Sequence, residues 1–78
     1  MMNRQAEVNR LDEADRHISR GEIAVSKQLA MVERLKHDGH DTAEAVRQLS
    51  DFEAVLATMR ERRSSIAKLI EQIDAGLA

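Results

Sequence analysis

The sequence has no cysteine and no proline, and its 78 residues include only three glycines and one aromatic residue, Phe52. Without cysteine there are no disulfides and no thiol chemistry. One aromatic ring is too few for a base-stacking surface or for the aromatic lining of many ligand pockets. No apolar run approaches the ~18 residues of a membrane span. These absences favour a cytoplasmic protein with no nucleic-acid, membrane or small-molecule partner and no cofactor.

Charged residues and good helix formers make up much of the chain. A third of the residues are charged, and the net charge is only -2 because acids and bases are interspersed. Such a mixture favours long helices and lacks the basic stripe of a nucleic-acid binder. The length allows a single domain, residues 1–78, whose small core would make association with other chains the usual source of extra stability.

The helical pattern is interrupted once, in the middle of the chain. Gly39 can adopt the left-handed conformation that ends a helix. Asp41 is a good N-cap, and Glu44 follows three residues later as in a capping box. Stop and start signals this close together predict an antiparallel hairpin of two helices. The expected boundaries are a helix over residues 3–37, a turn over 38–41 and a helix over 42–76.

Apolar residues recur every seven positions in both halves, which is the pattern of a coiled-coil seam, the line along which two helices meet. The expected pairs, such as Val25 with Leu56 and Leu11 with Ile70, are symmetric about the peptide that follows His40. The predicted seam residues are Val8, Leu11, Ile18, Val25, Leu29 and Val32 in the first half, and Leu49, Phe52, Leu56, Met59, Ile66, Ile70, Ile73 and Leu77 in the second.

Three charged residues share this heptad pattern. Asp15 and Glu22 stand one turn either side of Ile18, and Arg63 is the predicted partner of Ile18. The pattern predicts a partly buried cluster of Asp15, Glu22 and Arg63 that fixes the register. A carboxylate pair could instead serve acid/base or metal chemistry, but an arginine between the two acids would keep both ionised and fill the space.

Histidines offer no complete metal site, because His37 and His40 flank a turn and would supply two ligands beside Asp38 and Asp41. Helix-end and turn roles account for these four residues, and no metal is expected.

One side of the predicted hairpin is partly apolar, whereas the other carries mainly polar residues. We call the first side the apolar flank, and we expect a second copy to cover it, giving a homodimeric four-helix bundle. Its predicted contact residues are Ala14, Gly21, Ala24, Met31, Leu35, Val55 and Leu69.

The five residues from His17 to Gly21 resemble the H-x-x-[KR]-G core of histidine phosphotransfer domains. That resemblance implies an exposed phosphoacceptor, His17, with Arg20 placed to neutralise a phosphate. The structural interpretation is that His17 is a surface residue and that Gly21 permits close packing. Phosphotransfer, or mimicry of it, is therefore one alternative function.

The chain also resembles a group of short bacterial helical-hairpin proteins that have no established activity. The shared pattern covers about residues 11–60 and consists of His17-Ile18, Gly21-Glu22, Gln28, Leu35, the turn Gly39-His40-Asp41-Thr42, Ala45 and Leu49. The resemblance implies the hairpin fold. The leading interpretation is a non-enzymatic interaction or scaffold protein that acts through helix faces. A further alternative is an adaptor or antagonist that pairs with the helices of another protein.

Overall fold

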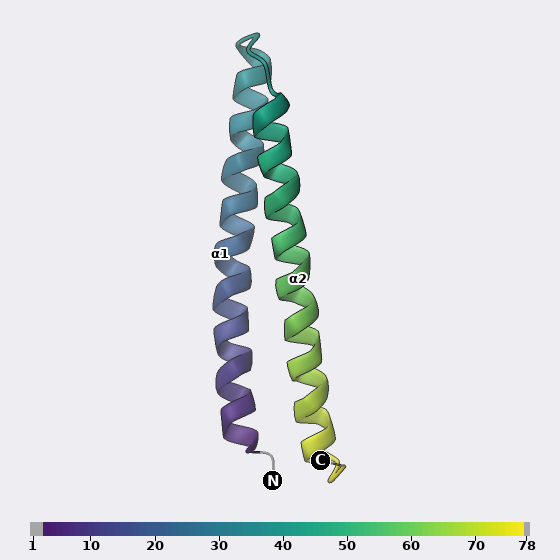
Figure 1. The fold of residues 1–78 in the computed structure, drawn as a ribbon. Coiled ribbons are helices and arrows are strands. Elements are labelled where there is room, and N and C mark those ends of the chain that lie inside the picture. The colour runs from purple at the N-terminus through teal and green to yellow at the C-terminus, as the bar shows by residue number, and fades with distance from the viewer. Residues whose placement is uncertain (1–2, 78) are drawn as a thin grey trace.

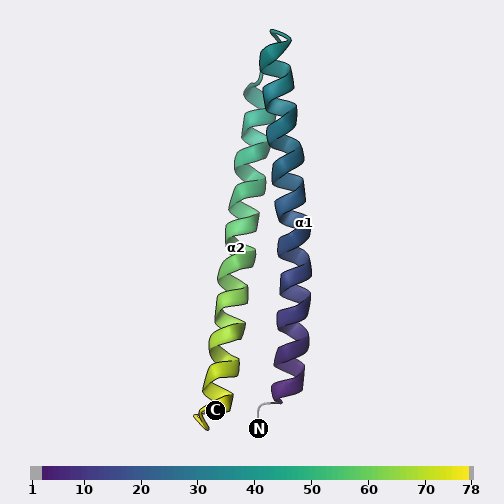
Figure 2. The same ribbon diagram turned by 180° about the vertical axis from the view of Figure 1, so that it is seen from behind.

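A computed structural model describes residues 3–77, which form two helices, α1 (Arg4–His37) and α2 (Ala43–Asp74). The helices run side by side in opposite directions, joined by one short turn (Figure 1). The predicted all-α helical hairpin is confirmed. It measures 58 × 15 × 14 Å, and the helices lie closest near the turn and separate towards the termini, as the view from behind also shows (Figure 2).

Glycine ends both helices, as the sequence predicted for the first. Gly39 has φ +75°, and the amide of His40 donates to the carbonyl of Leu35 at 2.9 Å while that of Gly39 donates to Lys36 at 3.2 Å. These are the two hydrogen bonds of a Schellman motif. Gly76 repeats the motif after α2. Asn3 begins α1, because its side chain accepts hydrogen bonds from the second and third amides beyond it.

The predicted capping box at the start of α2 is wrong. Thr42, not Asp41, is the N-cap, and its own side chain makes no capping hydrogen bond. Asp41 Oδ1 instead accepts from the amide of Ala43 at 2.9 Å. Glu44 does not reach back to the cap, since its carboxylate binds Arg47 on the next turn at 2.6 Å. The turn is therefore one residue longer than expected.

The seam agrees with the prediction over much of α2, although Phe52 is exposed, and it is rotated on α1. Leu56 and Ile66 are among the most buried residues of α2. On α1 the predicted seam residue Leu29 is 46% exposed, whereas Ala14 and Gln28 are buried. The surface of α1 that packs against α2 thus includes a row of residues that the heptad pattern had assigned to the apolar flank. The row has seven-residue spacing and consists of Glu7, Ala14, Gly21, Gln28 and Leu35.

The rotation follows from what each face of α1 would bury. The predicted face would take the carboxylates of Asp15 and Glu22 out of water, which is costly without full pairing. The observed face buries one carboxylate, that of Glu7, whose Oε1 accepts a hydrogen bond from Arg10, and otherwise places small side chains and Gln28 against α2. A Cβ built on Gly21 would lie only 3.1 Å from Leu56 Cδ1. Gly21 therefore lets the helices approach closely at mid-length.

The register is also slightly different from the prediction. The cross-helix pairs Arg4–Asp74 and Asp15–Arg63 are each symmetric about Gly39 rather than about the peptide after His40. The predicted partners Val25 and Leu56 nevertheless line one shallow hollow on the polar side. The shift is consistent with the rotated α1 face, because a different row of α1 now sets which α2 residues lie opposite.

Candidate functional site

The apolar flank contains a hollow of about 380 Å³ between the helices. Its floor is apolar, with Ala14, Val55 and Met59, and basic groups from Arg10 and Arg62 stand around it. The full lining is Arg10, Glu13, Ala14, His17, Val55, Thr58, Met59 and Arg62. The hollow is open to solvent along one side of the hairpin, so it is a groove suited to an extended surface rather than a closed ligand cavity.

The predicted contact residues divide into three groups in the structure. Ala14 is buried and Gly21 packs against Leu56, so these two belong to the seam within the hairpin and not to an open flank. Met31 and Val55 are about half exposed, as a contact surface requires. Three further residues, Ala24, Leu35 and Leu69, are half-buried.

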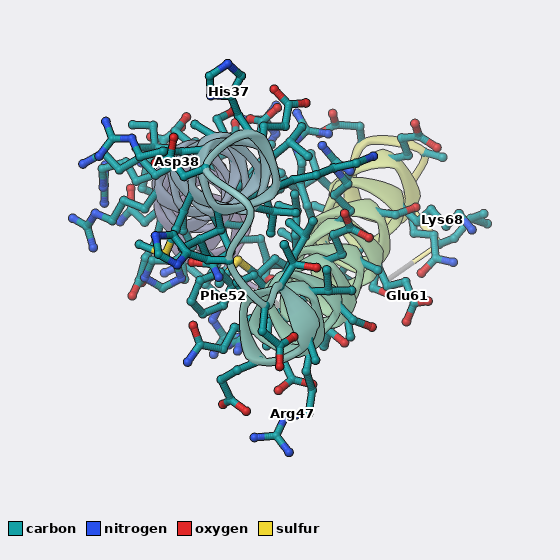
Figure 3. The ribbon with its side chains drawn as sticks, turned by 90° about the horizontal axis from the view of Figure 1, so that it is seen from above. His37, Asp38, Arg47, Phe52, Glu61 and Lys68 are labelled. Carbon is teal, nitrogen blue, oxygen red and sulfur yellow. The ribbon has the colours of Figure 1, made fainter. Side chains whose placement is uncertain are left out.

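Large apolar side chains of α2 remain open to solvent, and one of them, Val55, lines the groove. Val55 is 52% exposed, and Phe52 is also exposed, although it occupies a seam position of the heptad pattern. Viewed from above the turn, Phe52 lies on the side where the two helices meet, whereas His37 and Arg47 point outward at opposite edges (Figure 3). Half-exposed apolar residues beside a groove are typical of a surface that receives another helix.

His17 lies at the edge of the groove, with its side chain 46% exposed. Its Nε2 is 3.8 Å from Glu13 Oε1, one helical turn earlier. Arg10 and Arg62 line the same groove. The histidine is thus accessible, has a carboxylate beside it, and shares its surroundings with two guanidinium groups.

The predicted cluster of three charged residues is confirmed for Asp15 with Arg63 and is wrong for Glu22. Arg63 Nε donates to Asp15, but Glu22 lies 3.5 Å from Arg60 instead. All four side chains are 43–57% exposed, so these are two separate surface ion pairs on the polar side of the hairpin. Pairs of this kind contribute roughly 0–1 kcal/mol each.

A third cross-helix ion pair lies at the open end. Arg4 Nε donates to Asp74 Oδ1 at 2.7 Å. This hydrogen bond, together with the positive charge of Arg4, lowers the pKa of Asp74 from its ordinary value. The same contact raises the pKa of Arg4.

Gln28 is the buried polar residue that sequence reasoning assigned to the wrong surface. It is 6% exposed, and its Nε2 donates to the carbonyl of Ala45 at 2.9 Å and to Gln48 Oε1 at 3.2 Å. A buried polar residue with a specific partner fixes helix register. The seven-residue spacing from Ala14 and Gly21 was the sequence signal, because it placed Gln28 in a row of small residues.

No group of three potential metal ligands occurs among His, Asp and Glu side chains of residues 3–77. Near the turn, His37 Nδ1 is 3.3 Å from Asp38 Oδ1, and the ring of His37 points away from the hairpin (Figure 3). Neither described helix is long and apolar enough to cross a membrane.

Comparison with protein-family models, with curated proteins and with solved structures gives no match for this chain.

Proposed function

We propose that the protein is a non-enzymatic interaction module that acts by self-association through its apolar flank, two hairpins together forming a four-helix bundle. One observation carries the proposal: half-exposed Val55 lines a groove with an apolar lining that the hairpin itself leaves open. Each helix has one partner in the single chain and would have two in the bundle.

The hairpin exposes more surface than a compact chain of its mass. Its accessible surface is 5959 Å². A compact 8.8 kDa protein is expected to expose about 4,800 Å². Among residues 3–77 no large side chain is fully buried. The excess, about 1,200 Å², is comparable with the surface buried in a small specific interface.

Sedimentation equilibrium of Val55→Asp tests the proposal. Burying an unpaired carboxylate in the interface should raise the dimer Kd by at least roughly tenfold. Ile23→Asp is a matched control, since Ile23 is 55% exposed, apolar and outside the lining of the groove. We expect Ile23→Asp to leave the Kd unchanged. A wild-type protein that stays monomeric at micromolar concentration, or equal effects of the two variants, would contradict self-association through this flank.

If the wild type is monomeric, an adaptor that offers the same flank to the helices of another protein becomes the better explanation. The same pair of variants would then separate binding through the groove from binding elsewhere.

A phosphotransfer role for His17 is the second candidate. It is favoured by the position of His17 in a groove that also carries Arg10 and Arg62, because guanidinium groups bind phosphoryl oxygens well. Incubation with an acyl phosphate should then label the protein in an acid-labile way, and His17→Ala should abolish the label while His37→Ala retains it. Equal labelling of both variants would exclude this role.

A further inference from the structure

We infer that the two hairpins of the dimer pair with their turns at the same end, with Lys27 and Arg34 of one copy opposite Asp51 and Glu44 of the second. This inference rests on the proposed self-association and adds its orientation and its charged contacts.

The edges of the apolar flank are defined by the groove. Glu13 lines the groove from α1 and Thr58 lines it from α2. Residues seven positions apart lie on the same face of a helix in a coiled-coil hairpin. We call the two rows that contain Glu13 and Thr58 the rims of the flank. The α1 rim is Glu13, Arg20, Lys27 and Arg34, and the α2 rim is Glu44, Asp51, Thr58 and Ser65.

The rims carry opposite charge near the turn. Lys27 and Arg34 make the α1 rim basic there, and Asp51 and Glu44 make the α2 rim acidic. All four residues are exposed, and among residues 3–77 Lys27, Arg34 and Asp51 form no ion pair within the hairpin.

Acidic and basic rim residues also stand at matching heights. The cross-helix contacts Arg4–Asp74, Asp15–Arg63, Glu22–Arg60 and Gly21–Leu56 all centre within about two residues of Gly39, so residues equally far from Gly39 along the chain lie at about the same height. By the same rule, Lys27 is level with Asp51, and Arg34 is level with Glu44. Within one hairpin, no ion pair joins these basic and acidic residues across the helices.

A two-fold axis parallel to the hairpin brings them together. With the turns at the same end, α1 of each copy faces α2 of the other at the same height. Lys27 then meets the second copy's Asp51, and Arg34 meets its Glu44. Further from the turn, Arg20 meets Thr58 and Glu13 meets Ser65, so no like charges oppose each other along the rims.

The alternative axis, perpendicular to the hairpin, places the turns at opposite ends. In that arrangement α1 faces α1 of the second copy, and α2 faces α2. With the axis at the mid-length of α1, Arg20 would face Arg20 of the second copy, which is unfavourable, and only Lys27 with the second copy's Glu13 would attract, so this arrangement has fewer attractive rim contacts than the other. Charge complementarity therefore selects the arrangement with both turns at one end.

Charge exchange tests the contacts. Lys27→Glu and Asp51→Lys should each raise the dimer Kd about tenfold or more, because each change turns two symmetric attractions into repulsions. Two further chains test the same contacts together: one carries Lys27→Glu and Arg34→Glu, and the other carries Asp51→Lys and Glu44→Lys. In an equimolar mixture, these two chains should form a heterodimer in preference to either homodimer. The matched controls are Lys68→Glu and Glu61→Lys, whose side chains point outward from α2 (Figure 3), and these should leave the Kd unchanged.

Spin labels at the turn measure the orientation directly. The chain has no cysteine, so His37→Cys provides a single labelling site on an exposed, outward-pointing position. Turns at the same end predict a label separation of roughly 30 Å across the bundle. Turns at opposite ends predict roughly 50 Å, since the hairpin is 58 Å long.

The outcomes separate the two proposals. A dimer with the short separation and a preferred heterodimer from the exchanged chains supports the inference. A dimer with the long separation, or one in which the mixture shows no preference, overturns the orientation and leaves self-association standing. A monomer in sedimentation equilibrium overturns both.

Discussion

Replacing Gln28 provides the sharpest test of the rotated seam. The side chain is almost wholly buried, and its amide donates to the Ala45 carbonyl and to Gln48. Gln28→Ala removes both hydrogen bonds, at about 1 kcal/mol each, and most of a buried side chain, at about 0.8 kcal/mol per methylene group. We expect a loss of about 2–3 kcal/mol in the free energy of unfolding.

That loss is large for a chain of this length. In a 78-residue domain 1 kcal/mol corresponds to about 6 °C, so Gln28→Ala should lower Tm by roughly 12–18 °C. Thermal unfolding followed by circular dichroism at 222 nm measures the shift. Because association adds apparent stability by mass action, the comparison is best made in the Val55→Asp background or over a range of protein concentrations.

Gln28→Leu separates packing from hydrogen bonding. Leucine loses the two hydrogen bonds but buries apolar surface of similar volume, and the two contributions nearly cancel. The Ala45 carbonyl keeps its place in the helical hydrogen-bond ladder of α2. We expect stability within about 1 kcal/mol of wild type. Gln48→Ala is the control for the weaker hydrogen bond and should cost below about 1 kcal/mol. A loss smaller than about 0.5 kcal/mol in Gln28→Ala would mean that the amide is solvated, and would refute the rotated seam.

Two further substitutions test the close approach of the helices and the ion pair at the open end. Gly21→Ala gains about 1 kcal/mol of helix propensity but crowds the side chain of Leu56. The substitution should therefore stabilise a chain that carries Leu56→Ala more than it stabilises the wild-type chain. Equal changes in the free energy of unfolding, measured in urea, would contradict the contact. Arg4→Gln should raise the pKa of Asp74 towards its ordinary value, measured by NMR titration of the carboxyl carbon. The pKa of Asp74 is lower in the folded state than in the unfolded state. The stability that this pair contributes is therefore fully present above the unfolded-state pKa and is lost as the pH falls through the folded-state pKa. An Asp74 titration unaffected by Arg4→Gln would contradict the pair.

The sequence was sufficient for the hairpin because its signals were local. Gly39 marked the end of α1, because the observed Schellman hydrogen bonds need a residue with positive φ at this position and glycine adopts that conformation without strain. The seam of α2 was equally clear, since its heptad rows include Leu56, Met59 and Ile66, with Arg63 as the exception. Local backbone preference and a continuous apolar stripe do not require knowledge of the partner helix.

The face of α1 could not be settled in the same way. Its row Leu11, Ile18, Val25 and Val32 has a neighbouring row on each side, and either neighbour completes a heptad seam. One neighbour contains Val8 and Leu29 but also two acids, whereas the other contains one acid, Glu7, together with small residues, glutamine and Leu35. The number of large apolar residues favours the first row as the seam, whereas the free-energy cost of burying carboxylates favours the second row. Counting the charge on each row, besides its apolar residues, would have identified the observed face.

The groove residues were only partly predictable for a related reason. His17, Ala14 and Val55 were recognised from the sequence, whereas Arg10, Glu13 and Thr58 were not considered. The missed residues are polar and border the groove with their side chains, so an apolar pattern does not reveal them. Their positions follow once one member of each row has been placed, because Arg10 lies seven residues before His17.

The internal packing of the hairpin and its proposed association are linked through the rotation of α1. Had Asp15 and Glu22 faced α2, the whole of α1 would be turned by one heptad row, and Lys27 and Arg34 would point away from a second copy placed on the apolar flank. With Gly21 and Gln28 in the seam instead, the basic rim comes to the edge of the groove, level with the acidic rim of α2. A substitution in the seam that rotated α1 to the predicted orientation should therefore weaken the dimer, even though the substituted residue does not contact the second copy. The open flank has two oppositely charged edges because the hairpin buries the row of Gly21 and Gln28 and leaves Asp15 and Glu22 exposed.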